Sequence, residues 1–231
     1  MLFLNGFERK DVSKMLGNYK AILFVIVLCC VCSSLLLLAF TALQPFHERN
    51  LLNEQHRHIL IAAGLVKSTA QLSRIDSEKL FSDHIRRSAT FDKLLLFNIV
   101  TDNNHIIGFV MPFAIQGVWG EIQGYIGVQS DKNTILGFTV SRHSETPGLG
   151  AEIQSAAFSD NFVGKHLRDH EGMMVGIMVS KGHVNDLLLS ESRANYVDGI
   201  TGATLTGKAI TLGFKSLVTK YESFLNEKSV K

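Results

Sequence analysis

The hydrophobic and polar positions divide the chain into an N-terminal apolar segment and a longer region of mixed character. Residues 21–43 contain no charged side chain. As a helix they would span about 34 Å, enough for a bilayer core of about 30 Å. A cleaved signal peptide is the alternative, but its apolar core is usually about 7–15 residues long. We therefore predict a flank at residues 1–20, an uncleaved transmembrane helix at 21–43 and an outer domain at 44–231.

Beyond the anchor, short apolar runs bounded by polar turns predict strands. They occupy residues 93–100, 106–111, 122–129, 134–140 and 173–179. The first two runs and the next two each enclose a short polar turn, so each pair predicts a β-hairpin. The chain shows no alternation of strand and helix and no Gly-x-Gly-x-x-Gly motif, which argues against a Rossmann site. The predicted fold class is α+β, with mainly antiparallel strands and flanking helices.

Helices are predicted both before and after these strands in the sequence. Residues 44–65 predict a polar helix that leaves the membrane and ends near Gly64, and residues 67–87 are polar and helical or irregular. The last helix begins near Thr206 and presents one apolar face. Its apolar residues recur at intervals of three, four and seven: Ile210, Phe214, Leu217, Val218, Tyr221, Phe224 and Leu225.

A hydroxyl-rich turn precedes this last helix. It places Thr204 at or just before a helix N-terminus, where free N–H groups and the helix dipole favour a phosphate. Gly202 and Ala203 keep the turn small, and Lys208 adds a nearby cation. On these grounds Thr204 and Thr206 are both possible phosphate acceptors, and either could instead be an ordinary helix N-cap.

A second loop contains Pro147, Gly148 and Gly150, which fix one φ angle and allow close backbone approach. A flat aromatic ring could lie on such a loop. The alternative is a tight connection between a strand and a helix starting near Ala151.

Charge and cysteine usage exclude several functions. The chain has a formal net charge of +2, and the basic excess lies in the flank before the apolar segment. That flank holds Arg9, Lys10, Lys14 and Lys20 against Glu8 and Asp11. This predicts a cytoplasmic N-terminus and an outward-facing C-terminal domain. The outer domain is formally neutral and therefore has no electrostatic footprint for nucleic acid.

All the cysteines, Cys29, Cys30 and Cys32, fall inside the apolar segment. The outer domain therefore has no disulfide, no thiol nucleophile and no thiolate metal ligand. His166 and His170 are four residues apart but lack a convincing third ligand, so a solvated pair is favoured over a metal site. The sequence shows no Ser-His-Asp or Cys-His arrangement that would indicate hydrolysis.

Two motifs together resemble the signatures of the FMN-binding domain of sodium-pumping respiratory complexes. They are His-Ser-Glu-Thr-Pro-Gly-Leu-Gly at residues 143–150 and Asp-Gly-Ile-Thr-Gly-Ala-Thr at residues 198–204. The C subunit of the sodium-translocating NADH:quinone reductase and the G subunit of the Rnf complex share that domain. The chain has Thr201 where the family usually has Ser, and Ser144 where it commonly has Gly. Neither difference touches Thr204.

The remaining likeness runs from about Tyr19 onward and favours the C subunit. It is carried by Val-Cys-Ser at 31–33, Leu-Gln-Pro at 43–45, Asn-Leu-Leu-Asn at 50–53, Ile-Leu-Ile-Ala-Ala-Gly-Leu at 59–65, and Gly-Val-Trp-Gly at 117–120 followed by Gly-Tyr at 124–125.

The resemblance implies a covalent FMN, joined by a phosphoester to Thr204 rather than Thr206. The other implied cofactor-binding residues are Thr201, Gly202, Ala203, Asp198, Glu145, Thr146, Gly148, Leu149, Gly150, Lys208 and Trp119. Trp119 could shield the flavin ring or belong to the core. His143 could hydrogen-bond the flavin or its phosphate.

The implied function is that of a membrane-anchored flavoprotein subunit, which carries electrons toward quinone in a complex that exports sodium. The subunit by itself is not implied to be catalytic. The implied partners are the A, B, D, E and F subunits of that complex, membrane lipid, and a flavin transferase for maturation. The implied location is the bacterial inner membrane, with a single pass and a periplasmic FMN domain. The Rnf G subunit and a flavin-free anchored binding domain are the alternatives.

Overall fold

The computed structural model describes residues 5–70, 72–88, 94–184 and 190–227. The chain divides into two compact units, Met1–Leu51 and Leu52–Lys231. Helix α1 (Asn5–Ala62) forms most of the first unit, and its last residues, from Leu52 onward, belong to the second. Residues 1–4 of the predicted flank and Lys93 of the first predicted strand lie outside the described residues.

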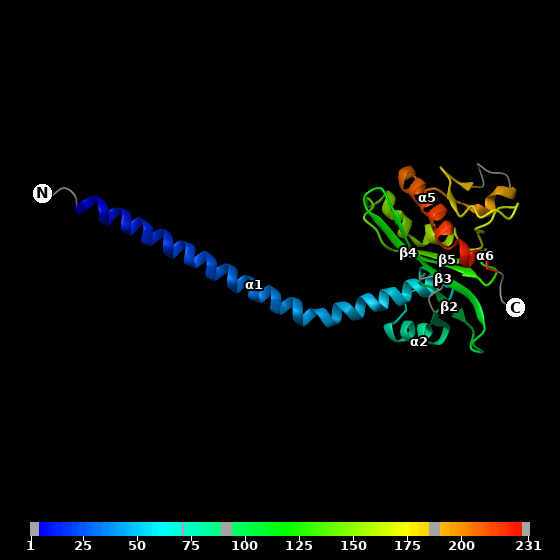
Figure 1. Ribbon diagram of the computed structural model, residues 1–231, viewed down its shortest axis with the longest axis horizontal. Helices are drawn as coiled ribbons and strands as arrows, with labels where there is room; N and C mark the ends of the chain where they lie inside the picture. The colour runs from blue at the N-terminus through cyan, green and yellow to red at the C-terminus, as the bar shows by residue number, and fades with distance from the viewer. Residues whose placement is uncertain (1–4, 71, 89–93, 185–189, 228–231) are drawn as a thin grey trace. The chain divides into compact units, whose positions relative to one another are not determined.

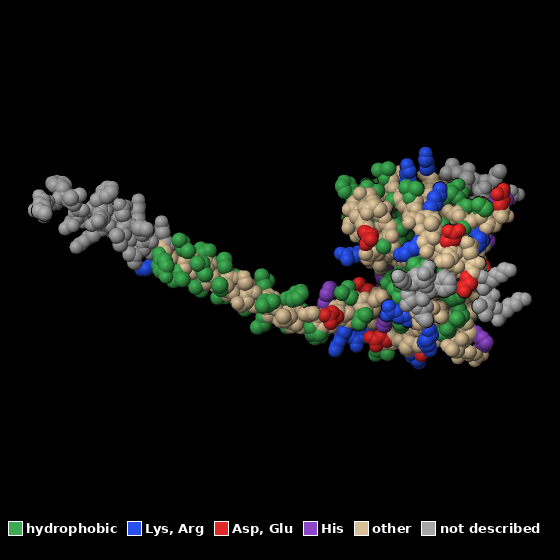
Figure 2. Space-filling view, in the orientation of Figure 1, with side chains coloured by type: hydrophobic (Ala, Val, Ile, Leu, Met, Phe, Trp, Pro, Cys, Tyr) green, Lys and Arg blue, Asp and Glu red, His purple; other side chains and the backbone are tan. Residues whose placement is uncertain are grey.

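Helix α1 is continuous through the two helices predicted at 21–43 and 44–65, with Pro45 inside it. Its stretch Tyr19–Ala62 is, among the described residues, the one helix that is long and apolar enough to cross a membrane, and its best window has a mean hydropathy of 3.0. Hydrophobic side chains cover this helix in Figure 2. The structure thus has an N-terminal helix with the length and composition of a membrane anchor, while the three predicted domain bounds stay a prediction.

The end of α1 confirms the predicted stop near Gly64. The N–H of Leu65 bonds to the carbonyl of Leu60, and the N–H of Gly64 bonds to that of Ile61. Gly64 has a φ of +71°, which an L side chain rarely adopts. This is the Schellman arrangement, in which a left-handed glycine satisfies the last helical carbonyls.

The second unit is built on a five-stranded sheet in the order β1-β2-β3-β4-β5, with every neighbouring pair antiparallel. The strands are β1 (Ile85–Arg87), β2 (Phe97–Val100), β3 (Ile106–Gln116), β4 (Glu121–Gln129) and β5 (Ile135–Arg142). Both predicted hairpins, β2–β3 and β4–β5, are confirmed. Strand β1 follows α2 (Arg74–His84) within the stretch predicted to be helical or irregular, and it is too short to show a period in the sequence.

Helices cover both faces of this sheet, which makes the unit α+β as predicted. Alternate strand residues face opposite sides, so Met111 joins the cluster under α5 (Thr204–Lys220), while Val110 joins Ile59 and Leu60 of α1. Figure 1 shows α5 and α2 on opposite sides of the sheet.

Two glycines let the end of α1 approach the sheet closely. Gly127 of β4 and Gly137 of β5 are direct partners in the sheet register. A Cβ atom on Gly127 would lie 1.9 Å from the carbonyl oxygen of Ala62, and one on Gly137 would lie 2.4 Å from that of Ile61. The end of α1 therefore packs directly against the backbone of β4 and β5 at these two glycines.

Two sequence predictions in the C-terminal half need correction. The strand predicted at residues 173–179 is reduced to β6 (Met178–Val179), which pairs in parallel with β7 (Tyr196–Val197). Gly176, with a φ of +72° and packed against the backbone of Phe214, breaks the extended run.

The helix predicted near Ala151 is a 3₁₀ turn, η1 (Gly150–Gln154), and the short helix α3 (Ala156–Asp160) follows it. A second 3₁₀ turn, η2 (Ser190–Asn195), precedes β7, and α6 (Glu222–Asn226) follows α5. The predicted last helix is therefore interrupted at Tyr221.

Candidate functional site

Three loops meet at the first turn of α5, and two of them carry the sequence motifs. A Cβ atom on Gly202 would lie 2.7 Å from Cδ2 of Leu149, and one on Gly150 would lie 2.6 Å from Oγ1 of Thr206. The third loop joins β3 to β4, and a Cβ atom on its Gly120 would lie 3.1 Å from the Ser144 side chain. The fold thus brings residues 117–120, 143–150 and 198–204 together.

The buried carboxylate of Glu145 ties these loops to the helix. Its Oε1 accepts hydrogen bonds from the N–H groups of Val118 (2.8 Å) and Trp119 (3.1 Å), and its Oε2 accepts one from the hydroxyl of Thr206 (2.7 Å). Glu145 is only 5% exposed. Its carboxylate is therefore a structural centre of the site, whereas the sequence marked it only as a cofactor contact.

His143 supports the same loop. Its Nδ1 accepts a hydrogen bond from the N–H of Glu145 (3.2 Å), and its Nε2 lies 3.3 Å from Oε1 of Gln154. Both ring nitrogens thus have partners within the protein.

The two candidate acceptors, Thr204 and Thr206, differ sharply in environment. Thr204 is the first residue of α5 and is exposed, and its hydroxyl has no hydrogen-bond partner in the described part of the chain. Thr206 is 4% exposed and donates to Glu145. The N-cap is Ala203, without a side-chain hydrogen bond, so the reading of either threonine as an ordinary cap is wrong.

A cavity of about 230 Å³ opens beside Thr204. It is lined by Val179, Ser180, Lys181, Ile200, Ala203, Thr204, Gly207, Lys208 and Thr211. Lys208 is where the sequence placed it, one helical turn after Thr204. Lys181 was missed, because nothing in its local sequence connects it with Thr204, which follows 23 positions later.

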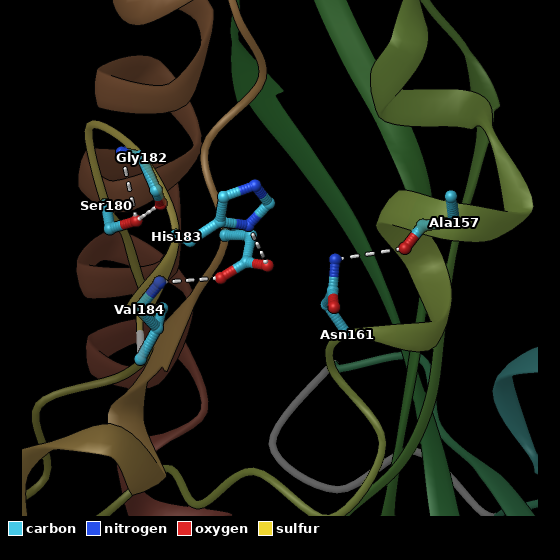
Figure 3. Close-up of polar contacts among 7 residues, drawn as sticks. Ala157, Asn161, Ser180, Gly182, His183 and Val184 are labelled. Atoms are coloured by element: carbon cyan, nitrogen blue, oxygen red, sulfur yellow. Dashed lines mark hydrogen bonds and ion pairs between the residues drawn. The ribbon is translucent and has the colours of Figure 1, made fainter. Parts of the chain in front are cut away.

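Asp198 begins the turn of residues 198–204, called the attachment turn because the resemblance predicts the flavin linkage there, and it holds the strap of residues 180–184. Its Oδ1 accepts from the N–H of Val184 (2.8 Å), and its Oδ2 lies 3.0 Å from Nδ1 of His183. Partial burial opposes ionisation, but these hydrogen bonds and the charges of His183 and Lys165 outweigh it and lower the pKa of Asp198. Figure 3 shows the strap with Ser180, Gly182, His183 and Val184.

Exposed apolar side chains lie on two of the three loops and in the first turn of α5. Trp119 is 71% exposed, which rules out the core alternative, and Leu205 is 67% exposed. Leu149 is 44% exposed and reaches the attachment turn at Gly202. These groups offer an apolar surface for a flat aromatic ring next to a phosphate position.

No group of three or more His, Cys, Asp or Glu side chains suited to a metal occurs among the described residues. Of the predicted histidine pair, His170 lies 3.8 Å from the carboxylate of its neighbour Glu171.

Comparison with known proteins places this site in a defined class of domain. Residues 117–219 match the model of the FMN-binding domain, so all three loops fall inside the match. The chain contains an FMN-binding domain.

The names of the similar proteins are more specific than the description of the domain. The chain is 33% identical over 150 residues to the C subunit of the Na(+)-translocating NADH-quinone reductase of Chlamydia trachomatis, a match that covers 61% of this chain and 48% of that protein. It is 25% identical over 236 residues to the corresponding subunit of Yersinia pestis, covering 84% of this chain and 86% of the relative. The matches at higher identity thus span about half the length of the relatives.

A solved structure extends the likeness to the fold. The crystal structure of the C subunit from Parabacteroides distasonis matches with a TM-score of 0.64 and 26% identity, over 80% of this chain and 98% of that one. These relatives are C subunits of the Na(+)-translocating NADH-quinone reductase by name, which agrees with the family that the two motifs resemble.

Proposed function

We propose that this chain is a membrane-anchored subunit of a sodium-translocating NADH:quinone oxidoreductase and carries electrons through an FMN joined by a phosphoester to Thr204. One observation carries the choice of residue. The hydroxyl of Thr204 is exposed and without a partner among the described residues, whereas that of Thr206 is buried and donates to Glu145. Only an accessible hydroxyl can meet a maturation enzyme and accept a phosphate.

The surroundings of Thr204 suit the phosphate end of FMN. A phosphodiester keeps one negative charge, and the N-terminus of a 17-residue helix and Lys208 both favour an anion at this place. Thr201, Gly202 and Ala203 form the small turn around the attachment point. The positive φ of Gly202, +78°, is a conformation that side chains rarely adopt.

The isoalloxazine ring would lie toward the loop of Thr146, Gly148, Leu149 and Gly150, next to Trp119. Leu149 and Trp119 supply exposed apolar surface, and Gly148 has a φ of +72° with open space at its Cβ position. The bound FMN would supply the electron-carrying chemistry, and the chain would hold and orient it. Glu145 and Asp198 would shape the site through their internal hydrogen bonds.

The wider assignment rests on the relatives and on the anchor. It comprises the A, B, D, E and F subunits as partners, contact with membrane lipid, and maturation by a flavin transferase. The basic excess in the N-terminal flank supports a cytoplasmic N-terminus, which would place the FMN domain in the periplasm. The relatives described above are C subunits of the sodium-translocating reductase by name, which supports this assignment over the Rnf G subunit.

The test is flavin fluorescence of the denatured protein in a gel, after co-expression with a flavin transferase. We expect a fluorescent band for the wild-type chain, with peptide mass spectrometry placing FMN on Thr204, and a dark band for Thr204→Val. Thr219→Val is the matched control, because it removes an exposed hydroxyl from the same helix. A dark wild-type band would favour a flavin-free binding domain, and a fluorescent Thr204→Val band would move the attachment site.

A further inference from the structure

We infer that the cavity beside Thr204 receives the phosphate end of the flavin, and that Lys181 supplies a second cation for that phosphate. The inference rests on the proposed function and adds a residue that the sequence motifs do not contain. Lys181 and Lys208 line the same cavity as Thr204, although they come from the strap before β7 and from α5. At about 230 Å³, the cavity is smaller than the usual pocket for a whole drug-sized ligand. It suits the phosphate and the adjoining chain, with the ring outside.

The charged side chains in the described lining of the cavity are both positive. Among the described residues, two lysines and no carboxylate line the cavity. The carboxylate of Asp198, six residues before Thr204, accepts a hydrogen bond from the N–H of Val184 and lies 3.0 Å from Nδ1 of His183, and the charge of Lys165 also acts on it. An anion in the cavity would therefore balance the two ammonium groups.

Apart from Thr204, the neutral polar side chains of the described lining already have hydrogen-bond partners. The hydroxyl of Thr211 accepts from the N–H of Val179 (3.0 Å) and donates to the carbonyl of Gly207 (3.0 Å). The hydroxyl of Ser180 donates to the carbonyl of Gly182. The hydroxyl of Thr204 and the two lysines are thus the lining groups that can turn to a ligand.

The strap gives Lys181 a fixed backbone position. The N–H of Ser180 bonds to the carbonyl of Val197 (3.0 Å), and the N–H of Gly199 bonds to that of Gly182 (3.2 Å). A Cβ atom on Gly199 would lie 2.1 Å from the carbonyl oxygen of Ser180, so the strap and the attachment turn are in direct backbone contact. The hydrogen bonds of Asp198 to His183 and Val184 close the other end of the strap. Asp198 is therefore a positioning residue for Lys181.

The test separates phosphate recognition from covalent attachment. In full-length chain carrying Thr204→Val, purified in detergent, the dissociation constants of FMN and of riboflavin are measured by the change in flavin fluorescence. The two ligands differ only in the phosphate. We expect FMN to bind more tightly than riboflavin, and Lys181→Gln to weaken FMN about tenfold while leaving riboflavin unchanged. Lys208→Gln should act in the same way.

Lys215→Gln is the matched control, because Lys215 is an exposed lysine of the same helix that does not line the cavity. Equal FMN affinity in Lys181→Gln and Lys215→Gln would overturn the assignment of Lys181. Equal affinity for FMN and riboflavin in the Thr204→Val chain, or no binding of either, would overturn the phosphate cavity itself. The proposed function fails on a different result, the dark gel band of the wild-type chain, so the two failures are distinguishable.

Discussion

Replacement of Glu145 tests whether one buried carboxylate holds the site together. Glu145→Ala removes the acceptor for three donors, namely the N–H groups of Val118 and Trp119 and the hydroxyl of Thr206. A buried donor left without a partner costs about 1–3 kcal/mol. Because Val118 and Trp119 lie in an exposed loop, water can reach part of their backbone. We therefore expect the free energy of unfolding to fall by about 3–5 kcal/mol in total.

Glu145→Gln is the informative comparison. The amide oxygen can still accept from Val118 and Trp119, and the hydroxyl of Thr206 can accept from the amide NH₂ group. Its expected cost is about 1 kcal/mol. Glu152→Ala removes an exposed carboxylate just beyond the same loop, and it should change stability by less than about 0.5 kcal/mol.

The assay is thermal unfolding of the full-length chain in detergent, followed by the fluorescence of Trp119, the only tryptophan. At about 2–4 °C per kcal/mol, the midpoint should fall by about 10 °C in Glu145→Ala and by a few degrees in Glu145→Gln. The flavin yield should fall in the same order, because Thr204 shares the first turn of α5 with Thr206. A midpoint for Glu145→Ala no lower than that for Glu145→Gln would refute this account of the carboxylate.

Two further predictions concern the packing around the sheet. Gly127→Ala should destabilise the second unit by about 3 kcal/mol in thermal unfolding, because its Cβ would lie 1.9 Å from the carbonyl oxygen of Ala62. Gly172→Ala, with a φ of +82° but nothing within 4 Å, should cost only about 1 kcal/mol, and equal losses would contradict the packing argument. Burial raises the pKa of Tyr221 to about 12, and its hydroxyl donates to the carbonyl of Pro112 (3.0 Å). Since the unfolded value is about 10, the folded state favours the neutral phenol, and this stabilisation is present below pH 10 and lost as the pH rises toward 12. The wild-type chain should therefore be about 1 kcal/mol more stable than Tyr221→Phe at neutral pH. Alkaline unfolding curves should show that advantage shrinking above pH 10, and a constant difference would contradict the raised pKa.

Local sequence patterns were enough to predict much of the scaffold. Short apolar runs on either side of polar turns predicted both hairpins of the sheet. Gly64 marked the end of α1, because a left-handed backbone there favours glycine. The same kind of reasoning failed at residues 173–179, where Gly176 packs against Phe214 and breaks a run that looks extended in sequence.

The candidate site, like the scaffold, could be predicted from the sequence only in part. The sequence by itself placed Thr204 at or just before a helix N-terminus, with Lys208 nearby, because the apolar residues after Thr206 recur with the period of a helix. On physical grounds it left Thr204 and Thr206 equivalent as possible acceptors, and the family resemblance alone favoured Thr204. The tertiary structure gives a physical difference between them, because it brings Glu145 to the hydroxyl of Thr206 across 61 positions in the chain. It likewise placed Lys181 beside Thr204 through hydrogen bonds of the strap to Asp198 and Val197. Such contacts depend on how separate loops pack together. The hydrophobic period of one segment does not predict which side chain from a distant segment will contact it.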